Sequence, residues 1–163
     1  MKKSFPTRFE GPRDSPGFLL WQATNCWQRM QRDALALLGL THVQFVLLTV
    51  TFWLETQKSP PTQNRLAATA KTDKMMTSQI VRSLEQRKLL KRVRDPHDGR
   101  AFLLSTTEEG RHLVRLALPV VEKVDQDFFQ SLESTPQFCS DLRMLIESQN
   151  QQKSEELDDD EKK

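Results

Sequence analysis

Basic side chains gather in one short stretch of this 163-residue chain. Residues 61–104 hold ten Lys and Arg against four Asp and Glu, a formal charge of +6, whereas the whole chain carries +2. Guanidinium and ammonium groups at this density neutralise phosphates, so a nucleic acid is the polyanion that such a segment suits. A solvated basic face is the alternative interpretation, and charge alone leaves both open.

Motifs typical of enzymes and of metal sites are missing from the sequence. It has no glycine-rich phosphate loop and no nucleophile motif, and His42, His97 and His112 lack metal-ligand spacing. We therefore expect no catalytic residue, no metal and no cofactor. Cys26 is expected to be a small buried hydrophobe rather than a redox-active thiol. Two cysteines, no export signal and no apolar stretch long enough for a bilayer predict a cytoplasmic protein without membrane contact.

Helical patterns precede the basic stretch. Apolar residues spaced three and four apart predict a long helix over 17–38, which Gly39 ends. A capping box, Thr41-His42-Val43-Gln44, then opens a second helix that ends near Gln57. Five glycines and no tyrosine argue against a β-sandwich or barrel, which need frequent turns and strand formers. The chain is therefore expected to be mostly helical.

The basic stretch itself has the element order of a winged helix-turn-helix. Two short helices are predicted over 63–70 and 74–87, and Lys71-Thr72-Asp73 separates them with Asp73 as a cap. Strand candidates over 89–94 and 101–105 flank a turn rich in Pro, Asp and Gly, which predicts a hairpin. Helix, short turn, helix and basic hairpin form a DNA-binding arrangement.

The segments on either side of this DNA-binding part, residues 61–106, are predicted to form an arm, further helices and a tail. A second capping box, Thr106-Thr107-Glu108-Glu109, should open the C-terminal helices over 107–150. Residues 1–16 are expected to form a flexible arm before the domain of residues 17–150. The tail, 151–163, is rich in acidic residues and is expected to be disordered.

Four segments resemble the MarR family of bacterial transcriptional regulators. They are Gln63-Asn64-Arg65-Leu66-Ala67, Leu84-Glu85-Gln86-Arg87-Lys88-Leu89-Leu90, Arg94-Asp95-Pro96-His97-Asp98-Gly99-Arg100-Ala101 and Thr107-Glu108-Glu109-Gly110. The resemblance implies a homodimer formed through helices 17–38 and 107–150, which binds a pseudo-palindromic operator and usually represses. Lys71 departs from the pattern, because such proteins often have glycine in that turn, and it is expected to add a positive charge near phosphate.

The outward face of helix 74–87 is expected to enter the major groove. Its side chains opposite Met76, Ile80 and Leu84 can meet base edges, with Gln79 pairing with adenine and Arg82 with guanine or phosphate. In the wing, Asp98 should orient Arg100 toward the minor groove, while Arg94, at the base of the hairpin, should lie nearer phosphate. The predicted DNA-binding residues are Asn64, Lys74, Met75, Ser78, Gln79, Arg82, Arg94, Asp98 and Arg100.

The basic stretch and its element order predict a protein that binds double-stranded DNA, and the family resemblance implies that it is a homodimeric, ligand-responsive repressor of an operator. The family resemblance implies a small aromatic effector, and Trp21 and Trp53 are the candidates to line its cleft. The alternative is a dimeric winged-helix module that contacts proteins and does not read DNA. The polar, basic outward face of helix 74–87 favours DNA, because a protein-binding face would carry aromatic and aliphatic anchors.

Overall fold

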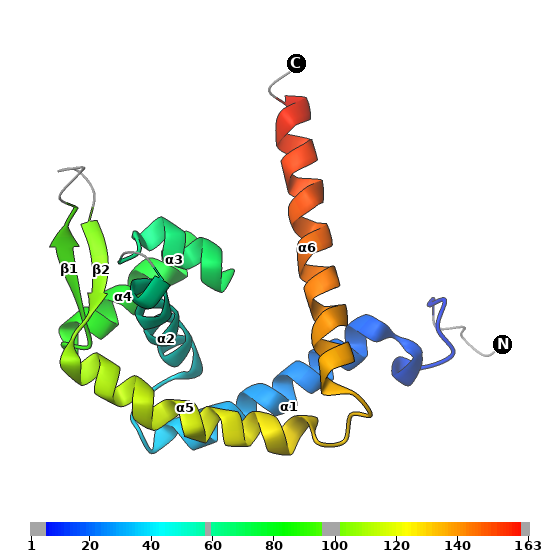
Figure 1. The fold of residues 1–163 in the computed structure, drawn as a ribbon. Helices are drawn as coiled ribbons and strands as arrows, with labels where there is room; N and C mark the ends of the chain where they lie inside the picture. Colours follow the sequence, from blue (N-terminus) through cyan, green and yellow to red (C-terminus); the bar gives the residue numbers. More distant parts are fainter. Residues whose placement is uncertain (1–5, 58–59, 96–101, 161–163) are drawn as a thin grey trace. The chain divides into compact units, whose positions relative to one another are not determined.

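Helices dominate the structure, and one small hairpin projects from them (Figure 1). Within residues 6–57, 60–95 and 102–160, which the computed structural model describes, the mostly helical class with a β wing is confirmed. The elements in chain order are a 3-10 turn (Pro12–Asp14), α1 (Pro16–Ala36), α2 (His42–Gln57), α3 (Gln63–Ala70), α4 (Lys74–Gln86), β1 (Leu90–Arg94), β2 (Phe102–Thr106), α5 (Glu108–Phe129) and α6 (Thr135–Asp160).

Side-chain caps fix where the helices begin. The first capping box is confirmed, because the Gln44 amide donates to Thr41 Oγ1 at 3.3 Å and the Thr41 amide donates to Gln44 Oε1 at 3.1 Å. Asp73 Oδ1 caps α4 by accepting from the Met76 amide at 2.7 Å. The second box is wrong. Thr107 alone caps α5, since the third helical position is Gly110, which has no side chain to reach back.

Three helices end on a residue with left-handed backbone, as Schellman turns require. Gly39 does so after α1, with φ of +63°, in agreement with its predicted role. Lys71 and Lys88 take the same conformation with φ of +54° and +57°. The turn between α3 and α4 therefore has the glycine-type conformation, and it gains a positive charge where glycine is common.

Two clusters of buried side chains form the core. The larger joins α1, α2, α4, β1 and α5 through Leu35, Leu40, Phe45, Leu48, Leu84, Leu89, Leu90, Val114, Ala117 and Val121. The smaller comprises Leu47 of α2, Leu66 of α3, Val81 of α4 and Leu104 of β2. Because each of its members comes from a different element, the smaller cluster sets the angle between α4 and the wing.

The wing is an antiparallel pair of strands, β1 and β2, and the residues just before α3 pair with the free edge of β2. Residues pair from Leu90 with Thr106 to Arg94 with Phe102. On the other side of β2, the Leu104 amide donates to the Pro61 carbonyl at 2.8 Å. The predicted hairpin is thus confirmed in its strands, and its turn lies outside the described residues.

The chain divides into two compact units, Met1–Val124 and Asp125–Lys163, and α5 runs from the first into the second. In the second unit the Phe129 and Phe138 rings lie 5.6 Å apart between centroids. Helix α6 extends to Asp160, through most of the segment for which the sequence predicted disorder. The Gln, Lys, Glu and Leu residues there are good helix formers. None of the helices in the described ranges is long and apolar enough to cross a bilayer.

Candidate nucleic-acid interface

Helix α4 packs on α2 and α3 through one face only. Thr77, Val81 and Leu84 are buried there, while Met76 and Ile80 are half-buried beside them. Of the predicted inward set of Met76, Ile80 and Leu84, Leu84 is fully buried, and it shares the deepest positions with Thr77 and Val81. Thr77 can be buried because its hydroxyl has a hydrogen-bond partner, the hydroxyl of Thr72 in the turn, at 2.8 Å.

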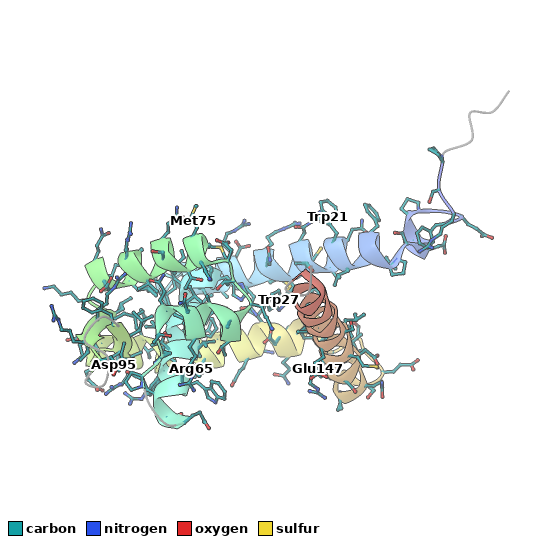
Figure 2. The ribbon with its side chains drawn as sticks, turned by 90° about the horizontal axis from the view of Figure 1, so that it is seen from above. Trp21, Trp27, Arg65, Met75, Asp95 and Glu147 are labelled. Atoms are coloured by element: carbon teal, nitrogen blue, oxygen red, sulfur yellow. The ribbon has the colours of Figure 1, made fainter. Side chains whose placement is uncertain are left out.

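The opposite face of α4 carries the predicted base-reading residues together. Lys74, Met75, Gln79 and Arg82 are exposed, and Ser78 is half-buried. Met75 is 74% exposed and lies on the outer side of the helix, as Figure 2 shows. Its exposure confirms that Met75 faces outward. The face is polar and basic apart from this methionine, which suits base edges and phosphates better than an apolar partner.

Helix α3 adds exposed side chains beside the turn. Asn64, predicted from the sequence, and Arg65 are both exposed in its first turn, followed by exposed Thr69 and Lys71. Arg65 was counted in the basic stretch but was not predicted as a contact, whereas the charge of Lys71 was expected to lie near phosphate. The left-handed conformation of Lys71 is the signal that marks it, since a lysine there presents its charge at the tip of the turn.

The wing presents its basic residues along β1. Lys91, Arg92 and Arg94 are exposed, and Arg92 Nε donates to Glu85 Oε2 at 3.0 Å, which ties β1 to α4. Arg94 is the last residue of β1 and pairs with Phe102, so it lies at the end of the strands that leads into the turn. Its expected place at the base of the hairpin is wrong, because the base is where Leu90 pairs with Thr106. Asp98 and Arg100, the predicted orienting pair, lie outside the described residues.

The two candidate effector residues are exposed. Trp21 is 60% exposed and Trp53 is 52% exposed. Trp21 lines a shallow hollow whose other members, Gln22, Asn25, Cys26, Gln28, Arg29 and Arg32, all come from α1. Trp53 does not contribute to that hollow. Cys26 is exposed, so its predicted burial is wrong for this chain, because α1 buries little beyond Gln31 and Leu35.

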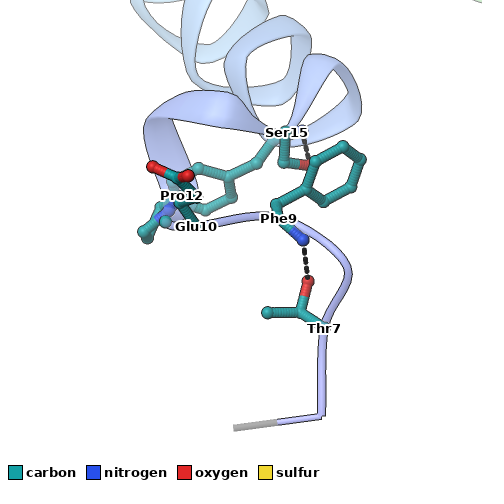
Figure 3. A pocket seen from close by; sticks show the side chains of 7 residues that line it. Thr7, Phe9, Glu10, Pro12 and Ser15 are labelled. Atoms are coloured by element: carbon teal, nitrogen blue, oxygen red, sulfur yellow. Dashed lines mark hydrogen bonds between the residues drawn. The ribbon is translucent and has the colours of Figure 1, made fainter.

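A further pocket lies in the N-terminal arm and contains none of the predicted site residues (Figure 3). Its lining residues are Thr7, Phe9, Glu10, Gly11, Pro12, Ser15 and Phe18. The Phe9 amide donates to Thr7 Oγ1 at 3.2 Å, which folds the arm locally. Among the residues that the structure describes, no three His, Cys, Asp or Glu side chains converge to hold a metal ion.

Solved structures with this architecture come from transcriptional regulators. CouR from Rhodococcus jostii RHA1, bound to p-coumaroyl-CoA, is 27% identical with a TM-score of 0.74, and the match covers 86% of this chain and 94% of CouR. A MarR-family transcriptional regulator from Rhodococcus sp. RHA1 is also 27% identical, with a TM-score of 0.71 and coverage of 86% and 95%. The fold and the winged motif are thus shared with regulators.

Sequence similarity decides the family. YdcH, an HTH-type transcriptional regulator of Bacillus subtilis (strain 168), is 47% identical over 140 residues, which cover 86% of this chain and 95% of YdcH. The profile of the family described as transcriptional regulator SarA/Rot matches residues 33–115. The chain belongs to the MarR and SarA/Rot family of winged-helix transcriptional regulators. It is a DNA-binding transcriptional regulator, and the basic stretch with its winged helix-turn-helix order had predicted DNA binding.

Proposed function

We propose that the chain is a homodimeric repressor that reads a pseudo-palindromic operator in the cytoplasm and releases it when a small aromatic effector binds. The observation that carries the proposal is the outward face of α4, where exposed Lys74, Gln79 and Arg82 stand over a buried inner face. A helix with that division docks its polar side in the major groove, and the wing's Arg94 reaches the adjacent backbone. Arg100, oriented by Asp98, is proposed to reach the minor groove, although both residues lie outside the described part of the chain.

Two helices supply the apolar surface that a homodimer would bury. Helix α1 exposes Phe18, Leu19, Leu20 and Trp21, which are 39–60% accessible. Helix α6 exposes Met144, Leu145 and Ile146, which are 50–63% accessible. Large side chains that are adjacent and exposed in one chain are typical of an association surface. A second copy of the same chain covers both helices in an isologous interface.

Gln79→Ala tests base reading. The amide of Gln79 can donate and accept on adenine at once, so its loss should weaken operator binding by about 1–3 kcal/mol and relax preference at one base pair. Fluorescence anisotropy against operator variants at each position measures both effects. Gln57→Ala is the matched control, because it removes the same amide from an exposed position at the end of α2.

If Gln79→Ala binds the operator and each of its single-base variants as tightly as the parent protein does, Gln79 does not read a base. Loss of base preference in Gln57→Ala would instead indicate that removing a side-chain amide lowers the preference by destabilising the protein.

Effector binding is expected to shift the dimer toward an arrangement that cannot bind DNA. CouR was solved bound to p-coumaroyl-CoA. The exposed side chains of Trp21 and Trp53 support this part of the proposal, because an indole ring can stack on an aromatic ligand. A ligand lowers operator affinity only if it binds the DNA-incompetent arrangement more tightly. A panel of aromatic acids and their CoA thioesters should include one that changes tryptophan fluorescence and raises the operator Kd. A panel that changes neither quantity would count against this part of the proposal.

A further inference from the structure

A carboxylate lies at the base of the wing. Glu55, in the last turn of α2, has a side chain that is 10% exposed. Its oxygens accept from the Thr106 backbone amide at 2.9 Å and from the Thr106 hydroxyl. Arg111 of α5 donates from Nε to that hydroxyl at 3.0 Å, and its Nη2 lies 3.8 Å from the carboxylate. One hydroxyl therefore connects α2, β2 and α5.

This carboxylate is unfavourable on two counts. A buried charge loses hydration that only well-placed partners restore. A negative charge within a domain that binds a polyanion also opposes binding. Folding alone could be served by an apolar residue of similar size. The hydrogen bonds that Thr106 donates to this carboxylate therefore point to a role that needs directional bonds.

The bonds fall where the wing meets the helices. Thr106 is the last residue of β2, and Leu104, two residues earlier, is buried in the smaller core cluster. Leu104 and the Pro61 carbonyl hold the middle of β2, whereas Glu55 holds its base. Two separated attachment points prevent β2 from pivoting, so they fix the direction in which the wing projects.

We propose that Glu55, acting through Thr106, is a positioning residue for DNA binding. It holds the wing at the angle at which the wing and α4 engage one operator together. Without these bonds β2 pivots about Leu104, and the wing contacts weaken while the α4 contacts remain. This inference rests on the proposed function, in which the wing touches DNA.

Thr106→Val is the direct test, because it removes the hydroxyl and alters neither volume nor charge. The probes are the tightest-binding fragment selected from genomic DNA and the same fragment with its base order shuffled. We expect binding of the selected fragment to weaken by about fivefold or more, and binding of the shuffled fragment to change by less than about twofold. Thr106→Ser should restore parental affinity, since it returns the hydroxyl. Thr56→Val is the control, because that exposed hydroxyl bonds only the carbonyl of Trp53 in its own helix.

Measuring Thr106→Val in a second protein, which already carries Arg100→Ala, separates an effect on the wing contacts from an effect on stability. In Arg100→Ala protein the proposed wing contact is already missing, so Thr106→Val should then cost less than about twofold. An equal cost in both backgrounds would mean that Thr106 does not act through the wing, and would overturn the inference.

Glu55→Gln gives an independent test by the sign of its effect. Removing a negative charge by itself favours DNA, so Glu109→Gln, at an exposed position of α5, should bind the selected fragment equally or more tightly. Glu55→Gln should bind it more weakly, at a temperature where circular dichroism shows the protein folded. Parental or tighter binding by Glu55→Gln, or equal losses on selected and shuffled DNA, would overturn the inference. A parent that does not distinguish the two fragments would contradict the proposed function instead.

Discussion

Gly110→Ala is expected to destabilise the chain by about 3 kcal/mol or more, at the upper end of the cost of overpacking a core. A Cβ at this position would lie 2.1 Å from the carbonyl oxygen of Leu89 and 3.4 Å from Leu48 Cδ1. The oxygen belongs to the backbone and already accepts from the Thr107 amide at 3.1 Å, so it cannot move without breaking the start of α5.

Thermal and urea unfolding followed by circular dichroism measure the effect. Gly17→Ala is the matched control, because a Cβ there meets nothing within 4 Å and the residue lies in α1. It should leave stability unchanged or raise it by up to about 1 kcal/mol through helix propensity. If Gly110→Ala unfolds at the parental urea concentration, the close approach of α5 to Leu89 is not as described.

Leu145→Glu is expected to give a monomer with at least about a hundredfold weaker operator binding, because two linked half-site contacts become one. Leu145 is 61% exposed on α6 between Met144 and Ile146. A carboxylate at the centre of that patch would be buried without a partner in a symmetric dimer, and twice, since each copy carries it.

Light scattering at micromolar concentration and operator titration measure the two consequences together. Gln57→Glu, which adds the same charge at an exposed position at the end of α2, outside the helices expected to dimerise, should leave both unchanged. A Leu145→Glu protein with parental mass and parental operator affinity would show that α6 does not contribute to the dimer.

Local chemistry predicted the elements well. Thr41 and Gln44, Asp73, and the left-handed Gly39 each act within a few residues of their own position, so their roles could be predicted from spacing alone. The structure departs from the sequence predictions where a residue contacts a group that is distant in the sequence. The second capping box failed because Gly110, which the Leu89 carbonyl leaves no room to replace, occupies the position that a reaching side chain would need.

The residues of the candidate DNA-binding face could be predicted from the sequence, but the contacts that hold the wing in place could not. Lys74, Gln79 and Arg82 could be placed on one face because helical periodicity alone sets that face. The contact of Glu55 with Thr106 joins residues 51 apart in the sequence and follows no period, so no pattern indicated it. Exposure of Cys26 was missed for a related reason, since an apolar stripe on α1 looks the same whether its own chain or another one covers it.

Selection of bound fragments from genomic DNA, followed by footprinting of the enriched sequence, tests the central claim most directly. The proposal of a dimer with α4 in the major groove predicts an enriched pseudo-palindrome with half-site centres about 10 base pairs apart, or a multiple of that spacing. Protection should extend from each major-groove half-site into the flanking minor groove that the wing reaches. Recovery of fragments with no shared sequence, bound no more tightly than shuffled DNA, would contradict the account.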